Sequence, residues 1–207
     1  MAHVTVPDTP YQVRRTPTQY RASRQIERIL DAAARVVAEK GHTGTTTADI
    51  AKAATVSIGS VYRYFPDKVA VMRAVLDRNT RRFGERVAEE SPDAAPWQAV
   101  VAHAHAVYVE MCRTDEGFRA VSGAGLAAGE LEPETFDNPL AEVFADLLVR
   151  RFGFADTPPL RATLLQCVTV TDVLTRLAFR LAETGHQDTI DQGRRIFVDL
   201  LAPHAPA

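Results

Sequence analysis

Residues 45–68 constrain the fold of this chain more than any other stretch, and they read TTTADIAKAATVSIGSVYRYFPDK. Thr46 and Asp49 have the spacing of a capping box, in which each side chain accepts a hydrogen bond from the other residue's backbone N–H at the start of a helix. Ser57 is a favoured N-cap and marks a second start. The stretch therefore predicts two short helices joined by a tight turn. Because helices of about two turns cannot bury enough surface to fold alone, they must pack on a neighbour and present their other side.

The outward side of the second helix carries groups suited to contact with nucleic acid. They are Ser57, Gly59, Ser60, Tyr62, Arg63 and Tyr64. Small residues at the helix start let the backbone approach another surface, and the free N–H groups and positive dipole end favour phosphate there. Capped helix pairs are also common as plain structure in all-α proteins, so the pattern alone leaves both interpretations open.

The order of residues in this stretch resembles a known family. The run S-x-G-S-V-Y-R-Y-F-P-D-K, after T-T-x-x-D-I-A-K-A-A, is similar to the tetracycline-repressor (TetR) family of transcriptional regulators over residues 25–76. The preceding helix ends in A-E-K-G-H-T-G, as that family's first helix does. Thr55 departs from the pattern, because the family usually has Gly at the turn between the helices. If that turn needs a positive φ, a β-branched residue there is strained.

The resemblance implies a transcriptional regulator, more specifically a repressor of a palindromic operator, whose second short helix lies in the major groove. Arg63 is then the best candidate for reading guanine, because a guanidinium can bond O6 and N7 together. Tyr62, Tyr64 and Lys68 resemble family positions that contact the phosphate backbone, although either tyrosine could instead pack in the core. The full set of implied DNA contacts is Thr46, Thr47, Ser57, Ile58, Gly59, Ser60, Tyr62, Arg63, Tyr64 and Lys68.

Charge and composition agree with this interpretation. Residues 1–66 hold 9 Lys and Arg against 5 Asp and Glu, whereas residues 67–207 hold 15 against 21. A basic N-terminal third on an acidic body is typical of proteins that bind nucleic acid. We expect a flexible arm over 1–20, a helix-turn-helix domain over 21–66, and a helical body over 67–207 that begins with a connecting helix at 67–90.

Catalytic motifs do not emerge from the sequence. It contains no G-x-S-x-G, P-loop, Rossmann glycine fingerprint or H-E-x-x-H. His103 and His105 would point to different sides of a helix, so they do not predict a metal site. We expect no enzyme activity, cofactor or metal. An all-α enzyme with a structural helix-turn-helix and a ligand-independent DNA-binding protein remain alternatives.

Two further compositional features bear on location. Cys112 and Cys167 are far apart in sequence and are expected to be reduced, buried residues. The chain shows neither a signal-peptide pattern nor a run of 18 apolar residues, so we expect a cytoplasmic protein without a membrane span.

The body is expected to be helical throughout, which makes the fold class all-α. Apolar residues at helical spacing predict helices over 96–113, 139–152, 158–183 and 188–201, and glycines and prolines predict a short helix and long loops over 114–138. The helix over 158–183 is apolar almost all round, which predicts a homodimer seam shared with 188–201, or alternatively a central helix of a monomer. The predicted seam residues are Leu164, Val168, Leu174, Leu177, Leu181, Phe197 and Leu200.

Large and polar-tipped residues on the inward sides of the body predict a pocket for a small apolar or aromatic effector. The alternative is that each of them only fills a core. The predicted pocket residues are Phe83, Trp97, His103, Tyr108, Met111, Phe118, Phe136, Phe144, Cys167 and Thr171.

Overall fold

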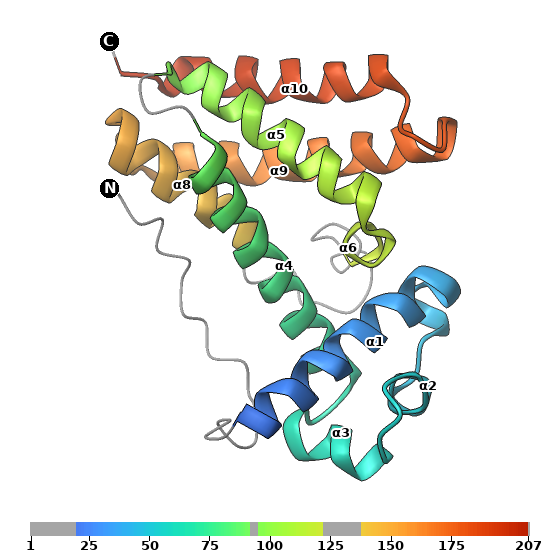
Figure 1. The fold of residues 1–207 in the computed structure, drawn as a ribbon. Helices are drawn as coiled ribbons and strands as arrows, with labels where there is room; N and C mark the ends of the chain where they lie inside the picture. Colours follow the sequence, from blue (N-terminus) through green and yellow to red (C-terminus); the bar gives the residue numbers. More distant parts are fainter. Residues whose placement is uncertain (1–19, 92–94, 122–137, 207) are drawn as a thin grey trace. The chain divides into compact units, whose positions relative to one another are not determined.

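The computed structural model describes residues 20–91, 95–121 and 138–206, and this part of the chain is helical without a strand (Figure 1). The all-α fold class is thereby confirmed. The helices are α1 Tyr20–Gly44, α2 Thr47–Ala53, α3 Ile58–Tyr64, α4 Lys68–Glu90, α5 Trp97–Thr114, α6 Glu116–Ala120, α8 Pro139–Phe152, α9 Pro158–Leu181 and α10 Gln187–Leu201, followed by a short 3-10 turn at Ala202–His204.

The described residues form two compact units. The N-terminal unit contains residues 20–79 and 115–121, and the body contains 80–91, 95–114 and 138–206. The first half of α4 therefore belongs to the N-terminal unit, as does α6, whereas the predicted domain boundary lay at residue 66. The predicted arm lies outside the described residues, apart from Tyr20 at the start of α1.

The core of the N-terminal unit joins α1, α2, α3 and the start of α4. Ile29, Ile50, Val61 and Met72 are fully buried there, one from each helix. The α6 helix packs on α1 through Gly117, where an added Cβ would lie 2.8 Å from Ala34 Cβ. A side chain at Gly117 would therefore separate the two helices.

Local signals in the sequence explain where the helices of this unit begin and end. Gly41 interrupts α1 with φ 72° and ψ 167°, within the A-E-K-G-H-T-G run that was expected to end the first helix. The Asp67 carboxylate accepts the Ala70 N–H at 2.8 Å and so caps the start of α4. Asn79 Nδ2 donates to the Val121 carbonyl at 3.4 Å and so ties α4 to the end of α6.

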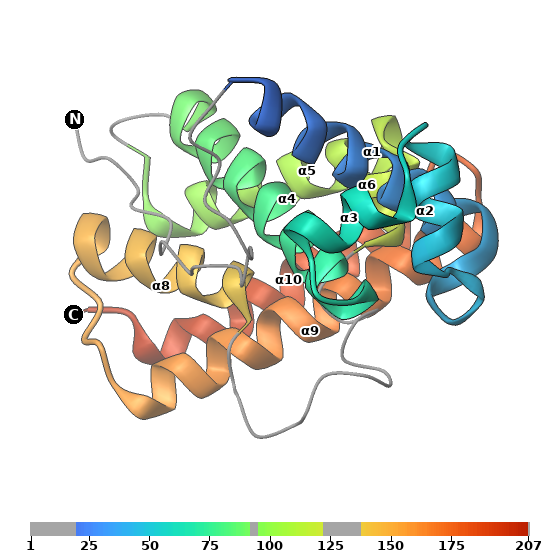
Figure 2. The ribbon, with the colours of Figure 1, turned by 90° about the horizontal axis from the view of Figure 1, so that it is seen from below.

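In the body, α9 and α10 lie side by side, and α8 and α5 pack against this pair (Figures 1 and 2). Aromatic rings connect the helices through the core. Phe83 on α4 meets Tyr108 on α5 edge-on at 6.1 Å between ring centroids, and it meets Phe144 on α8 at 6.0 Å. Phe144 in turn lies 4.7 Å from Phe197 on α10. Four helices are thereby held to one aromatic core.

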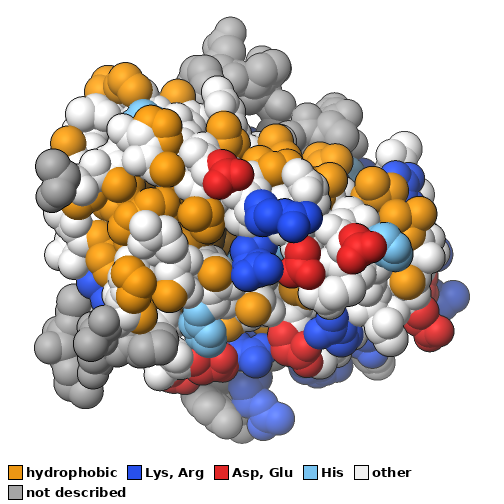
Figure 3. Space-filling view, turned by 90° about the horizontal axis from the view of Figure 1, so that it is seen from above, with side chains coloured by type: hydrophobic (Ala, Val, Ile, Leu, Met, Phe, Trp, Pro, Cys, Tyr) orange, Lys and Arg blue, Asp and Glu red, His pale blue; other side chains and the backbone are white. Residues whose placement is uncertain are grey.

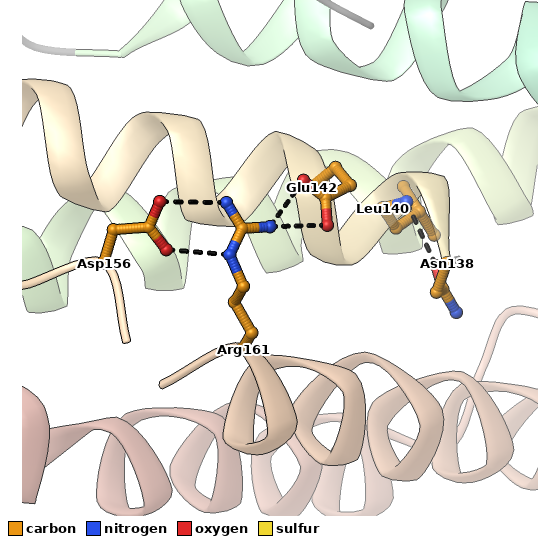
Figure 4. Close-up of polar contacts among 5 residues, drawn as sticks. All are labelled: Asn138, Leu140, Glu142, Asp156 and Arg161. Carbon is orange, nitrogen blue, oxygen red and sulfur yellow. Dashed lines mark hydrogen bonds and ion pairs between the residues drawn. The ribbon is translucent and has the colours of Figure 1, made fainter. Parts of the chain in front are cut away.

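The ends of α8 and α9 are fixed by caps and by one arginine (Figure 4). Asn138 caps α8 by accepting the Leu140 N–H at 3.0 Å. Arg161, in the first turn of α9, donates to Glu142 on α8 at 2.8 and 2.9 Å and to both oxygens of Asp156 at 2.7 and 3.0 Å. This pairing lowers the pKa of Asp156 and holds the α8–α9 connection against α8.

Among the described helices, α9 is long and apolar enough to cross a membrane by length and composition alone. A core helix passes the same test. One side of α9 is buried in the body, and charged residues such as Arg176 and Arg180 interrupt it. Packing on α8 and α10 accounts for the apolar residues on its buried side.

Candidate functional site

The helix pair α2–α3 begins at the residues that the sequence predicted. Thr46 caps α2 with both halves of the capping box: its hydroxyl accepts the Asp49 N–H at 3.1 Å, and the Asp49 carboxylate accepts the Thr46 N–H at 3.1 Å. Ser57 caps α3 by accepting the Ser60 N–H at 3.1 Å. The two hydroxyls of Ser57 and Ser60 also lie within 2.9 Å of each other. Both predicted N-caps are confirmed.

The connection between these helices has the strained geometry that the sequence suggested. Thr55 has φ 55° and is the one non-glycine residue with positive φ in the described chain. Its N–H donates to the Lys52 carbonyl at 3.1 Å, and Arg28 on α1 donates to the Ala54 carbonyl at 2.8 Å. Hydrogen bonds on both sides of the turn therefore hold a β-branched residue in a left-handed conformation.

The α3 helix separates its outward residues from its buried ones. Val61 is fully buried, whereas Ile58 is 46% exposed, Tyr62 is 42% exposed and Arg63 is exposed. The exposed side chains lie on the side predicted to meet DNA, together with Ser57 and Gly59 at the helix start.

Tyr64 departs from the expectation of a phosphate contact. Its ring is only 6% exposed and belongs to the core of the N-terminal unit, and its hydroxyl donates to Gln25 Oε1 on α1 at 3.4 Å. Tyr64 is therefore a core residue, which was the alternative interpretation of the two tyrosines. Because Tyr62 lies two residues earlier on a helix, its ring points to another side and remains available.

Two other predicted phosphate contacts already have partners within the chain. The Thr46 hydroxyl donates to Asp49 Oδ2 at 2.6 Å, so its proton is engaged in the cap and leaves Thr47 as the neighbouring hydroxyl. Lys68 Nζ donates to the His42 carbonyl at 3.2 Å, which positions it beside the end of α1.

Asp49 carries the main electrostatic perturbation at this site. Lys40 on α1 bonds to Asp49 Oδ1 at 2.6 Å, and the hydrogen bonds from Lys40 and Thr46 lower the pKa of Asp49 to about 2. The carboxylate is therefore ionised at neutral pH, and its charge is offset by the lysine that attaches α2 to α1.

Comparison with known proteins decides the family. The family described as "Bacterial regulatory proteins, tetR family" matches residues 29–75, which include α2 and α3. The crystal structure of a TetR-family transcriptional regulator from Streptomyces coelicolor is 30% identical, with a TM-score of 0.69, and the match covers 88% of this chain and 98% of that one. The chain belongs to the TetR family of transcriptional regulators.

Other TetR-family proteins share less with this chain. The fatty acid degradation regulator FadR from Bacillus halodurans has the same fold, with 19% identity, a TM-score of 0.60, and coverage of 86% of this chain and 94% of that one. The "Fatty acid metabolism regulator protein" of Bacillus subtilis (strain 168) is 26% identical over 120 residues, or 58% of this chain and 62% of that protein. The chain thus spans less than two thirds of the length of the curated relatives it matches.

The predicted effector residues are only partly brought together. Phe83, Tyr108 and Phe144 share the aromatic core of the body, and Met111, Cys167 and Thr171 are buried in the same unit. Burial raises the pKa of the Cys167 thiol to about 12, as expected for an unreactive buried cysteine. Trp97 packs edge-on against Phe154 at 5.5 Å, at the start of α5.

Three predicted pocket residues do not join this group. His103 is half-buried, and its buried Nε2 lies 3.9 Å from the Glu90 carboxylate at the end of α4. Phe118 is buried in α6, which belongs to the N-terminal unit. Phe136 lies outside the described residues.

Sequence reasoning missed three buried polar residues of the body, namely His105, Asp172 and Thr175. His105, rather than His103, is the buried histidine, and burial with the nearby Arg194 lowers its pKa to about 4. On α9, Asp172 and Thr175 are buried, and Asp172 accepts a hydrogen bond from Tyr108. The spacing of Asp172 and Thr175 could have predicted their burial, because both lie on the same side of α9 as the buried Leu164 and Val168.

The predicted dimer seam needs correction as well. Leu164, Val168 and Phe197 are buried within the body, so they face its own core and cannot meet a partner. Leu181 is 58% exposed, and the half-buried seam residues are Leu174, Leu177 and Leu200. Val170 and Val173, which the predicted seam lacked, are 36% and 50% exposed on α9.

With this correction, α9 carries an apolar stripe on its outward side, formed by Val170, Val173, Leu177 and Leu181 at helical spacing. The space-filling view in Figure 3 shows hydrophobic side chains gathered on one part of the visible face, with charged side chains more frequent on the other.

A metal site finds no support in the described residues, which contain no group of three His, Cys, Asp or Glu side chains placed to hold an ion.

Proposed function

We propose that this chain is a cytoplasmic, sequence-specific DNA-binding repressor that acts as a homodimer on a palindromic operator. The observation that carries the proposal is the division of α3 into two sides. Val61 and Tyr64 anchor it in the core, and Tyr62 and Arg63 face outward beside the small residues at its start. An anchored short helix with an outward arginine is what readout of bases in the major groove requires.

We further propose that a small apolar or aromatic ligand releases the repressor from DNA. The aromatic core formed by Phe83, Tyr108 and Phe144 supports this proposal, because such residues suit an apolar ligand. The relatives whose names refer to fatty acid metabolism and degradation agree with a lipid-like effector. The α4 helix is continuous from the N-terminal unit into the body, so it can transmit a change between them.

The release follows from linkage between the two binding events. A ligand that binds the DNA-incompetent state more tightly shifts the dimer toward that state. To move the population from mostly bound to mostly free, the ligand needs a preference of about 5 kcal/mol between the two states.

Selection of bound sequences from a random DNA pool tests the proposal. We expect enrichment of a palindrome whose half-sites lie about one helical turn apart. The selection is then repeated with the enriched operator in the presence of apolar metabolites. If no sequence is enriched, the result favours the alternative of an all-α enzyme with a structural helix-turn-helix. If a palindrome is enriched but no metabolite releases the protein from it, the result favours a ligand-independent DNA-binding protein.

A further inference from the structure

Three polar side chains lie buried where Tyr108 on α5 meets α9 in the body. Tyr108 donates its hydroxyl proton to Asp172 Oδ1 on α9 over 2.6 Å. Because residues three apart share a side of a helix, Thr175 lies on the same side of α9 as Asp172. Tyr108, Asp172 and Thr175 are called the polar cluster below, and each is less than 9% exposed.

Two atoms of the polar cluster have no hydrogen-bond partner within the protein, namely Asp172 Oδ2 and Thr175 Oγ1. Asp172 Oδ2 forms an ion pair with Arg176 Nη2 at 3.2 Å, but no aligned hydrogen bond reaches it. Buried polar groups in folded proteins are almost always hydrogen-bonded. Two neighbouring buried oxygens without a hydrogen bond therefore point to a ligand that supplies the partners.

The surroundings of the polar cluster indicate the shape of that ligand. The Tyr108 ring meets Phe83 at 6.1 Å, and Phe83 meets Phe144 at 6.0 Å. The polar cluster is therefore bordered by aromatic side chains. A molecule with an apolar body and one polar end matches this arrangement, because its body contacts the rings while its end reaches Asp172.

The chemistry of the polar cluster selects the polar end. An ionised carboxylate only accepts hydrogen bonds, and the Thr175 hydroxyl can also accept one. Burial, with Cys112 and Asp172 nearby, raises the pKa of Tyr108 well above its usual value, so its hydroxyl keeps its proton and remains bonded to Asp172. The open position on Asp172 therefore calls for a donor. Arg176 offsets the charge of Asp172, so a ligand carboxylate would add a second negative charge beside that pair and leave the core with a net negative charge, which is unfavourable at low dielectric.

We propose that the polar cluster binds the donor end of the effector, and that the effector is an uncharged apolar molecule ending in a hydroxyl or an amide N–H. This inference rests on the proposed function, because it assigns the ligand class of the same regulator. It excludes free fatty acid anions as ligands of this cluster.

Direct binding of three matched probes tests the assignment. Decan-1-ol, decyl methyl ether and decanoate share a decyl or nonyl chain but differ in donor and charge. Trp97, the only tryptophan, reports binding to the full-length protein through its fluorescence. We expect decan-1-ol to bind about tenfold or more tightly than the ether and decanoate, as for a hydrogen bond to a charged group.

Variants separate a binding role from a structural one. Asp172→Asn should abolish the preference for the alcohol and improve decanoate binding, because the amide is uncharged and can donate to a carboxylate. Asp199→Asn, at an exposed carboxylate on α10, should leave all three affinities unchanged. Thr175→Val keeps the side-chain shape and removes a buried hydroxyl that has no hydrogen bond, so it should raise the melting temperature of the ligand-free protein. The same change should weaken the binding of decan-1-ol several-fold.

Each result bears on the assignment. Equal binding of the three probes, no binding of any, or an unchanged preference in Asp172→Asn overturns it. An unchanged alcohol affinity in Thr175→Val, together with higher stability, would show that the cluster is bridged by internal water only. If the protein binds the alcohol selectively but enriches no operator, the proposed function is contradicted while the assigned ligand class is still supported.

Discussion

Thr55 has a left-handed backbone conformation, with φ 55°, that glycine adopts without strain. We expect Thr55→Gly to raise the free energy of unfolding by up to about 1 kcal/mol, because relief of about 1–2 kcal/mol of strain exceeds the extra entropy of an unfolded glycine. Urea unfolding measures the change. Ala53→Gly, two residues earlier at the end of α2, is the control and should lower stability, because its helical backbone gains nothing from glycine. A loss of stability in Thr55→Gly would show that the turn is not strained.

His105 makes the stability of the body depend on pH. Burial and Arg194 lower its pKa from 6.5 to about 4, with Asp191 acting weakly in the opposite direction. Between these pH values the unfolded state binds the proton more readily, so stability rises with pH; it is complete above pH 6.5 and is lost as pH falls toward 4. The contribution is about 3 kcal/mol at neutral pH.

Urea unfolding between pH 7 and pH 4 measures this dependence. His105→Gln should reduce the loss of stability over that range, because glutamine does not titrate. The same replacement at the exposed His186 should leave the loss unchanged. A wild-type profile that matches the His105→Gln profile would contradict the assignment.

At the level of the helix, boundaries were predictable wherever a single residue type decides them. Pro139 and Pro158 lie in the first turn of α8 and α9 as expected, and Thr46 and Ser57 cap α2 and α3. These outcomes depend on local backbone chemistry, which the sequence contains in full.

Orientation around the helix axis was less predictable. Because α9 is apolar nearly all round, periodicity did not separate the buried Leu164 from the exposed Leu181. His103 and His105 were expected on different sides of α5, but the inward one depends on what packs there. Tyr64 was similarly ambiguous, because a tyrosine on α3 serves equally as core or as phosphate contact until α1 is placed. These choices depend on tertiary packing between distant segments.

The outward side of α3 carries the prediction for DNA recognition. Arg63→Ala should lose discrimination at one or two base pairs per half-site, by roughly 1–3 kcal/mol for a bidentate guanine contact. Binding to the selected operator and to its single-base variants measures the change. Arg35→Ala, at an exposed arginine on α1, removes the same charge and should leave discrimination intact. An equal loss for every sequence after Arg63→Ala would assign it to phosphate instead.

Lys68 lies at the start of α4 and should behave differently from Arg63. Lys68→Ala should weaken binding to all sequences alike and reduce the slope of affinity against salt by about one phosphate's worth. Titrations at several salt concentrations measure that slope. If the slope is unchanged, Lys68 makes contacts within the chain, such as its bond to the His42 carbonyl, and none to phosphate.

For the whole molecule, the outward side of α9 is the apolar surface that a single chain leaves uncovered. Val170, Val173 and Leu181 expose apolar side chains along one stripe of a helix that is otherwise packed into the body. Apolar side chains gathered on one helix surface favour association, and a closed symmetric dimer buries the same stripe from both copies. Such a dimer would also present two α3 helices to a palindromic operator.

The burial of each apolar residue in the body determines whether a charge placed there disrupts the fold or only the proposed dimer. Val173→Glu should give a folded monomer, because Val173 is 50% exposed and its replacement loses contact only with the partner. Phe197→Glu should unfold the body, because Phe197 is buried against Phe144. Light scattering gives the mass, and circular dichroism tests the fold. Since a monomer reaches only one half-site, operator affinity should fall sharply for Val173→Glu. A Val173→Glu protein that remains a dimer with full operator affinity would show that the stripe on α9 is not the seam.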